Sequence, residues 1–259
     1  MKYAIPAVLL LFLAAEAQAA IRTEAVEYKQ GGTVLEGFLA YDDAVAGKRP
    51  GVLVVHEWMG LNPYAKKRAE QLAGLGYVAF ACDIYGKGVR PRDSKEAAAL
   101  AGKYKGDRAL LRARAAAGLD VLTKHSRVDP GRIAALGYCF GGMTALELAR
   151  SGAALAGAVS FHGVLDTPTP EDARKIKGKV LALHGADDPS VPPAQVTAFE
   201  DEMRKAGVDW QLVAYGGAVH GFTNPENGND SSKGVAYNEK ADRRSWEAMK
   251  AFFAEIFGK

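Results

Sequence analysis

Short apolar runs that alternate with longer, helix-patterned segments constrain the fold of this chain more than any other feature. Residues 51–55 are an unbroken apolar run, typical of a strand buried on both faces. Residues 64–75 follow with a helical pattern, and Gly76 stands where a helix would end. This alternation predicts an α/β fold, a mostly parallel sheet with helices on both faces. We expect further strands at 33–41, 77–82, 133–137, 156–162, 180–184 and 210–215, and further helices at 94–104, 109–124, 141–150, 195–205 and 238–257.

The N-terminus has the pattern of a secretory signal peptide rather than of folded structure. Lys2 gives a short positive start, residues 4–15 are apolar, and residues 17–19 form a small-x-small cleavage site. The apolar run is shorter than the roughly 20 residues that a membrane-spanning helix needs. We therefore expect residues 1–19 to be a cleaved signal peptide, with an uncleaved N-terminal anchor as the alternative.

The remaining residues 20–259 are expected to form a single domain that is secreted or periplasmic, after cleavage near Ala19 or Ala20. The chain is 48% hydrophobic with a net charge of +3, which excludes a disordered chain. The sequence has no block of five or more like charges, so nothing in it indicates a nucleic-acid partner. Two cysteines are too few for a disulfide scaffold. We expect a monomer without membrane contact after cleavage.

The segment that indicates chemistry is the Gly-x-Cys-x-Gly sequence at residues 137–141. It lies between a predicted buried strand and a predicted helix, which is the position of a nucleophile elbow, with Cys139 as the nucleophile. Gly137 and Gly141 leave room for the tight turn. The helix N-terminus stabilises a thiolate, and the backbone N–H of Phe140 points to where an oxyanion would form. The alternative is a buried structural cysteine in a glycine-rich turn.

An activated nucleophile needs a base, and the base needs an acid that orients it. Asp188 lies just after the predicted strand at 180–184, and His220 lies in a loop after the last predicted strand. Cys139, Asp188 and His220 therefore occur in the order nucleophile, acid, base, each at the carboxyl end of a strand. Taken singly, Asp188 could be a turn residue and His220 a solvated loop residue.

These motifs together resemble the dienelactone hydrolase family, thiol enzymes with the α/β-hydrolase fold. The resemblance extends from about residue 54 to the C-terminus. It rests on five ordered motifs: Val55-His56-Glu57-Trp58-Met59-Gly60, Asp83-Ile84-Tyr85-Gly86, Gly137-Tyr138-Cys139-Phe140-Gly141-Gly142, Gly185-x-x-Asp188-x-x-Val191-Pro192 and His220-Gly221-Phe222.

The resemblance implies roles for several residues. The catalytic triad would be Cys139, Asp188 and His220. Glu57 would be the partner of the resting thiol, which substrate binding releases toward the histidine. The backbone N–H groups of Trp58 and Phe140 would form the oxyanion hole.

Two departures from the family pattern concern the substrate. Members that cleave dienelactone hold its carboxylate with two arginines. Here the first position is Lys87, with Arg90 as a stand-in, and the second is Asn224. We therefore do not expect dienelactone itself to be the natural substrate. Tyr85 and His162 are further candidate substrate contacts, together with Lys87 and Arg90.

The sequence thus predicts a cysteine-dependent hydrolase of small carboxylic esters or lactones that acts through a thioester acyl-enzyme and needs no cofactor. Two alternatives stay open: a thiol redox protein that uses Cys139 with Cys82, and a non-catalytic ligand-binding member of the fold. The expected strand order opposes a disulfide, because it places the Cys82 and Cys139 strands on either side of a third strand. His56, His162 and His184 could suggest a metal, but no metal-ligand spacing occurs among them.

Overall fold

The computed structural model describes residues 21–258, and one eight-stranded sheet organises them. The strand order is β1-β2-β4-β3-β5-β6-β7-β8. The strands from β4 to β8 run parallel, while β1 and β2 are antiparallel additions at one edge. The strands are β1 (Ile21–Gln30), β2 (Thr33–Asp42), β3 (Arg49–Val55), β4 (Val78–Cys82), β5 (Val128–Tyr138), β6 (Gly157–Phe161), β7 (Lys179–Gly185) and β8 (Trp210–Tyr215).

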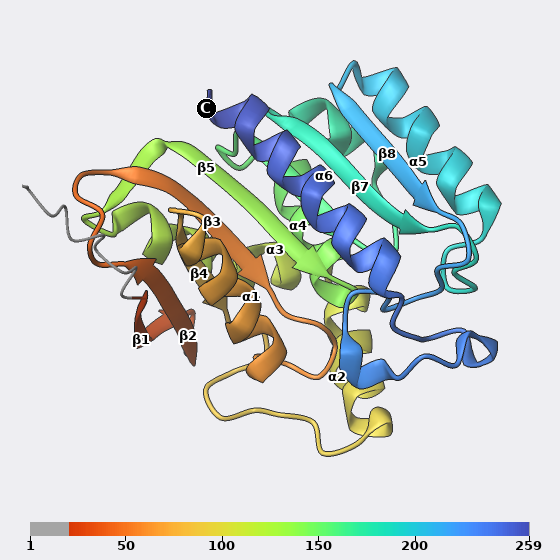
Figure 1. Cartoon of the computed structure of the whole chain (residues 1–259), viewed down its shortest axis with the longest axis horizontal. Coiled ribbons are helices and arrows are strands. Elements are labelled where there is room, and N and C mark those ends of the chain that lie inside the picture. Colours follow the sequence, from red (N-terminus) through yellow and green to blue (C-terminus); the bar gives the residue numbers. More distant parts are fainter. Residues whose placement is uncertain (1–20, 259) are drawn as a thin grey trace, which may run out of the picture.

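Helices cover both faces of this sheet, so the predicted fold class is confirmed (Figure 1). One face packs against α1 and α6, and the other against α3, α4 and α5. The two faces bury separate apolar clusters because β3 to β7 have apolar side chains on both sides. The helices are α1 (Pro63–Gly74), α2 (Ser94–Gly106), α3 (Arg108–Lys124), α4 (Phe140–Arg150), α5 (Pro193–Ala206) and α6 (Glu239–Phe257).

Strand β1 is the main element that the sequence pattern did not predict. Most of its side chains are exposed or half-buried, and Tyr28 is its one buried residue. An edge strand that faces solvent needs no apolar run, so it leaves little signal in the sequence. The predicted signal peptide, residues 1–19, lies outside the described residues. No helix within residues 21–258 combines the length and apolar character that crossing a bilayer requires.

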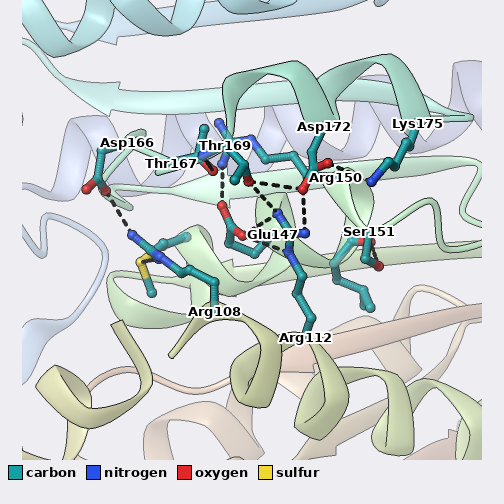
Figure 2. Close-up of polar contacts among 12 residues, drawn as sticks. Arg108, Arg112, Glu147, Arg150, Ser151, Asp166, Thr167, Thr169, Asp172 and Lys175 are labelled. Carbon is teal, nitrogen blue, oxygen red and sulfur yellow. Dashed lines mark hydrogen bonds and ion pairs between the residues drawn. The ribbon is translucent and has the colours of Figure 1, made fainter. Parts of the chain in front are cut away.

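A network of buried charges connects α3, α4 and α5 on one face of the sheet (Figure 2). Arg150 on α4 is fully buried and pairs with Glu202 on α5 at 2.8 Å and with Glu147 at 3.1 Å. Arg112 on α3 pairs with Glu147 at 2.8 Å and with Asp172 in the short 3-10 helix Pro170–Lys175 at 2.6 Å. Each buried charge therefore has a partner of opposite sign, which burial requires.

The carboxyl ends of the parallel strands form the edge where the site lies. The predicted strand order around β3 is confirmed, because Val55 pairs with Cys82 on one side and with Gly137 on the other. The turn after β3, the elbow after β5, and the loops after β7 and β8 meet at this edge (Figure 1).

Candidate active site

Cys139 occupies a sharp turn between β5 and α4. Its backbone has a φ of 55°, in the left-handed region that side chains rarely adopt. The flanking glycines make the turn possible: a Cβ on Gly137 would lie 2.1 Å from the Gly141 carbonyl oxygen, and one on Gly141 would lie 2.1 Å from that of Val55. The local sequence therefore permits a turn that holds the thiol at the N-terminus of α4.

The three residues of the predicted triad lie in one hydrogen-bonded row. The Cys139 Sγ is 3.0 Å from the His220 Nε2, and the His220 Nδ1 is 2.8 Å from the Asp188 Oδ2. Asp188 is 4% exposed, and its other oxygen accepts the backbone N–H of Ser190 at 2.8 Å. The loop that carries His220 is fixed by hydrogen bonds of its backbone with residues 234–236. The three residues are thus in contact in the order that a nucleophile, a base and an orienting acid require, and their catalytic roles stay a prediction.

The electrostatics of this row favour a charged histidine. Burial by itself lowers the pKa of His220, but the Cys139 sulfur and the Asp188 carboxylate outweigh it and raise that pKa to about 10. The imidazolium that results at neutral pH lies 3.0 Å from the Cys139 sulfur. Cys139 also lies at the N-terminus of α4, the positive end of that helix's dipole.

Glu57 lies in the same cavity as the thiol, and its hydrogen-bond partner is Asn224. The Asn224 amide donates to the Glu57 Oε2 at 2.7 Å. Burial raises the pKa of Glu57 to about 7, although the Asn224 hydrogen bond and the charge of His220 act in the opposite direction. The sulfur faces His220 in this structure. The role of Glu57 as partner of the resting thiol stays a prediction.

The two residues expected to supply the oxyanion donors, Trp58 and Phe140, line the same cavity as Cys139. Phe140 is the first residue of α4, where a helix leaves its backbone N–H groups without an intrahelical acceptor. Trp58 follows Glu57 in a turn closed by a hydrogen bond from the Gly60 N–H to the Glu57 carbonyl at 3.1 Å. Their oxyanion role stays a prediction, and the positions are compatible with it.

The cavity itself has a volume of about 560 Å³ and is mostly apolar. Its charged wall residues are Glu57, Lys105 and Glu226, in addition to His220. Trp58 and Val235 are among the few large apolar residues that the described chain exposes. The apolar wall consists of Trp58, Met59, Ala98, Ala101, Phe140, Val164 and Val235.

The four candidate substrate contacts from the sequence lie away from the cavity wall. Lys87 points to β1 and β2, where it pairs with Glu27 at 2.5 Å and Glu36 at 3.6 Å. Arg90 donates to the backbone carbonyls of Leu61 and Val89.

Tyr85 and His162 are both buried. Tyr85 donates from its hydroxyl to the Trp58 carbonyl at 2.9 Å, so it supports the wall from behind. His162 contacts the backbone of Cys139 at 3.1 Å.

The helix α2 supplies a cavity wall that the sequence analysis did not identify. Ala98, Ala101, Gly102 and Lys105 all line the cavity. Their spacing places them on one face of the helix, and this face of small residues was the signal available in the sequence.

His56 and Cys82 are both buried and do not line the cavity. His56 is buried, with its Nδ1 2.6 Å from the Glu57 carbonyl and its Nε2 accepting the Ile84 N–H at 3.2 Å. Within residues 21–258, no three His, Cys, Asp or Glu side chains gather as a metal site would require. Cys82 is a buried free thiol, and burial raises its pKa above the usual range.

Comparisons with known proteins identify the family of the chain. The model of the dienelactone hydrolase family matches residues 35–257. The solved structure titled m3DLH superposes with a TM-score of 0.88 and 45% identity, over 92% of this chain and 99% of that one. The dienelactone hydrolase-like promiscuous phosphotriesterase P91 from metagenomic libraries gives a TM-score of 0.86 and 44% identity, with the same coverage.

A curated relative from Bradyrhizobium sp., a probable 2-oxo-3-(5-oxofuran-2-ylidene)propanoate lactonase, is 31% identical over 78% of this chain and 86% of its own. The family resemblance read from the five sequence motifs is confirmed by these matches. The chain belongs to the dienelactone hydrolase family of α/β-hydrolases.

Proposed function

We propose that this protein hydrolyses small carboxylic esters or lactones with Cys139 as the nucleophile. The observation that carries the proposal is the row of contacts from the Cys139 sulfur to His220 at 3.0 Å and from His220 to Asp188 at 2.8 Å, open to a cavity of about 560 Å³. Cavities of this size suit small ligands.

The proposed reaction begins when the substrate carbonyl enters beside the sulfur. The thiolate, paired with the protonated His220, attacks the carbonyl carbon. The N–H groups of Phe140 and Trp58 stabilise the oxyanion, and one such donor is typically worth about 3 kcal/mol. The tetrahedral intermediate collapses to a thioester, and the leaving alkoxide takes its proton from His220. Neutral His220 then accepts a proton from water, whose oxygen attacks the thioester and releases the acid and the thiolate. No cofactor enters this sequence.

The cavity favours a neutral substrate over one with a carboxylate. The family positions of the two anion-binding arginines hold Lys87 and Asn224, and neither side chain is available as a cation in the cavity. Lys87 pairs with two glutamates outside it, and Asn224 is a neutral amide bound to Glu57. Among residues 21–258, Lys105 is the one lysine or arginine that lines the cavity.

The test is turnover by the purified protein of p-nitrophenyl acetate, a longer-chain p-nitrophenyl ester and a dienelactone. We expect turnover of the neutral esters, with a lower kcat/KM for the dienelactone. Cys139→Ala should abolish turnover, and Cys139→Ser should retain only a small part of it. Wild-type-like turnover by a folded Cys139→Ala protein would contradict the proposal, as would a wild-type protein that binds these ligands without hydrolysing them.

Phosphotriester hydrolysis is the second candidate activity. It is favoured by the name of the P91 relative and by the absence of an anion clamp, because a phosphotriester is a neutral molecule with an electrophilic centre. A p-nitrophenyl phosphotriester belongs in the same panel. Turnover that disappears in Cys139→Ala would support it, and absence of turnover would remove this candidate.

We also propose export of the protein, with residues 1–19 removed. N-terminal sequencing of the protein recovered from outside the cytoplasm tests this. A mature chain that begins at Ala20 or Ile21 is the expected result, and a chain that retains its apolar N-terminus would contradict it.

A further inference from the structure

The strongest unexplained feature is a buried histidine directly behind the nucleophile. His162 follows β6 and has no solvent exposure. Its Nδ1 accepts the backbone N–H of Cys139 at 3.1 Å, a donor that is shared with the Phe161 carbonyl at 3.0 Å. Its Nε2 lies 2.7 Å from the Thr223 Oγ1. Both ring nitrogens are thus committed to partners that are not substrate.

These contacts define the protonation state of the ring. Because the Cys139 N–H is a donor, the Nδ1 must be unprotonated, and the neutral ring carries its proton on Nε2. That proton is donated to the Thr223 hydroxyl. Burial holds the pKa of His162 well below its usual value, and the nearby positive charges of His220 and Arg68 act in the same direction.

The chain of hydrogen bonds continues from Thr223 to two helices. The Thr223 Oγ1 lies 2.6 Å from the Tyr64 hydroxyl on α1, which accepts from the Arg68 Nε at 3.2 Å. Arg68 also donates to the Thr223 carbonyl at 2.8 Å and pairs with Asp242 on α6 at 2.6 Å. His162 is therefore anchored from behind by groups that do not reach the cavity.

Backbone strain gives an independent reason to assign a function to this contact. Within the described chain, Cys139 and His162 are the only non-glycine residues with a positive φ, at 55° and 40°. Such conformations cost free energy and persist where the surroundings hold them in place. The two strained residues are hydrogen-bonded to each other.

We propose that His162 is a positioning residue for the nucleophile. Its Nδ1 holds the strained backbone of Cys139, and in this way it keeps the sulfur near His220 and the Phe140 N–H directed into the cavity. The inference rests on the proposed function, because it assigns a role relative to a reaction of Cys139.

Three variants separate positioning from simple packing. His162→Phe keeps an aromatic ring against Phe222 and His220 but removes both nitrogens. His162→Asn restores an acceptor near the Nδ1 position, and asparagine tolerates the left-handed backbone. Thr223→Val leaves His162 in place and removes the acceptor of its Nε2 proton. His125→Phe, beside Tyr41 and remote from the cavity wall, is the matched control.

The expected result is a loss in kcat with little change in KM for p-nitrophenyl acetate. For His162→Phe, we expect kcat to fall by about 100-fold. This is the effect that a displacement of a reacting group by about 1 Å can produce. The kcat of His162→Asn should be about tenfold higher than that of His162→Phe, and the kcat of Thr223→Val should be about tenfold lower than that of wild type. His125→Phe should stay within about twofold of wild type.

Two kinetic results would overturn the inference. The first is activity of folded His162→Phe within about twofold of wild type, and the second is a His162→Asn variant no more active than His162→Phe. If His162→Phe does not fold, Thr223→Val decides by the same kcat criterion. The ring-nitrogen NMR signals of His162 in the wild type give a readout independent of activity: the Nε2–H tautomer should persist from about pH 5 to about pH 9, and an Nδ1–H tautomer would also overturn the inference.

The Cys139→Ala variant distinguishes this inference from the proposed function. If turnover survives in Cys139→Ala, the proposed function fails whatever the His162 variants do. If Cys139→Ala is inactive while the His162 and Thr223 variants keep full activity, the hydrolase proposal stands and the positioning role fails.

Discussion

Substitution of Glu57 by glutamine tests whether a carboxyl group in the cavity opposes folding at neutral pH. Glu57 is 7% exposed, and burial raises its pKa from the ordinary value of 4.5 to about 7. Between these pH values the unfolded chain ionises this group while the folded chain keeps it protonated. The contribution to stability is therefore fully present below about pH 4.5 and is lost as pH rises through about 7.

The magnitude follows from the interval between the two pKa values. Each pKa unit corresponds to about 1.4 kcal/mol, so the interval from 4.5 to about 7 corresponds to a loss of about 3 kcal/mol. Glu57→Gln cannot ionise and escapes this loss. We expect the variant to gain about 2 to 3 kcal/mol in free energy of unfolding, relative to wild type, between about pH 5 and about pH 8.

The assay is urea unfolding of both proteins at these two pH values. The change in the difference between them is the test, because altered packing around the glutamine would shift both measurements equally. His220 titrates in both proteins and cancels to first order. Glu226→Gln, an exposed carboxyl at the same cavity, is the matched control, expected within about 0.5 kcal/mol of wild type at both pH values. A Glu57→Gln difference that is equal at pH 5 and pH 8 would refute the reasoning.

Three further substitutions test the site and its support. Asp188→Asn should lower kcat on p-nitrophenyl acetate by about a thousandfold or more, because His220 loses the carboxylate that is proposed to orient it. A loss below about tenfold would contradict this role of Asp188. Gly141→Ala places a Cβ 2.1 Å from the Val55 carbonyl oxygen and should lower the free energy of unfolding by about 2 kcal/mol or more, measured in urea; an unchanged midpoint would refute the steric argument. Arg150→Met leaves the buried Glu202 carboxylate without its cation, while Glu147 keeps Arg112, and should cost about 3 to 5 kcal/mol in the same assay; a variant as stable as wild type would show that the network is dispensable.

The sequence was informative wherever a local pattern has one physical solution. The glycines at 137 and 141 predict the tight turn because a side chain at either position would collide with backbone. The strand order predicts that Cys82 and Gly137 flank Val55, and this pairing is found. Both inferences depend on neighbours within a few residues, or on the topology of alternating strands and helices.

Contacts between distant segments could not be predicted from the sequence where no motif marked both partners. Lys87 was a candidate substrate contact because it holds the family position of the first arginine. Its partner Glu27 lies on β1, a strand whose polar, exposed pattern gives no signal. Glu57 and Asn224 are separated by 167 positions, so their hydrogen bond could not be predicted from spacing. His162 was expected to line the cavity wall for the same reason, since the backbone donor that occupies it belongs to another strand end.

One short segment connects these distant contacts. His220 contacts the sulfur, Thr223 accepts from the histidine behind the nucleophile, and Asn224 binds Glu57. The contacts of Cys139, His162 and Glu57 are therefore made by neighbouring residues after β8. A displacement of this segment would disturb all three contacts together, so its anchoring by Arg68 and Asp242 bears on the whole site. The ion pair between Arg68 on α1 and Asp242 on α6 therefore holds the segment that contacts Cys139, His162 and Glu57, in addition to any contribution to stability.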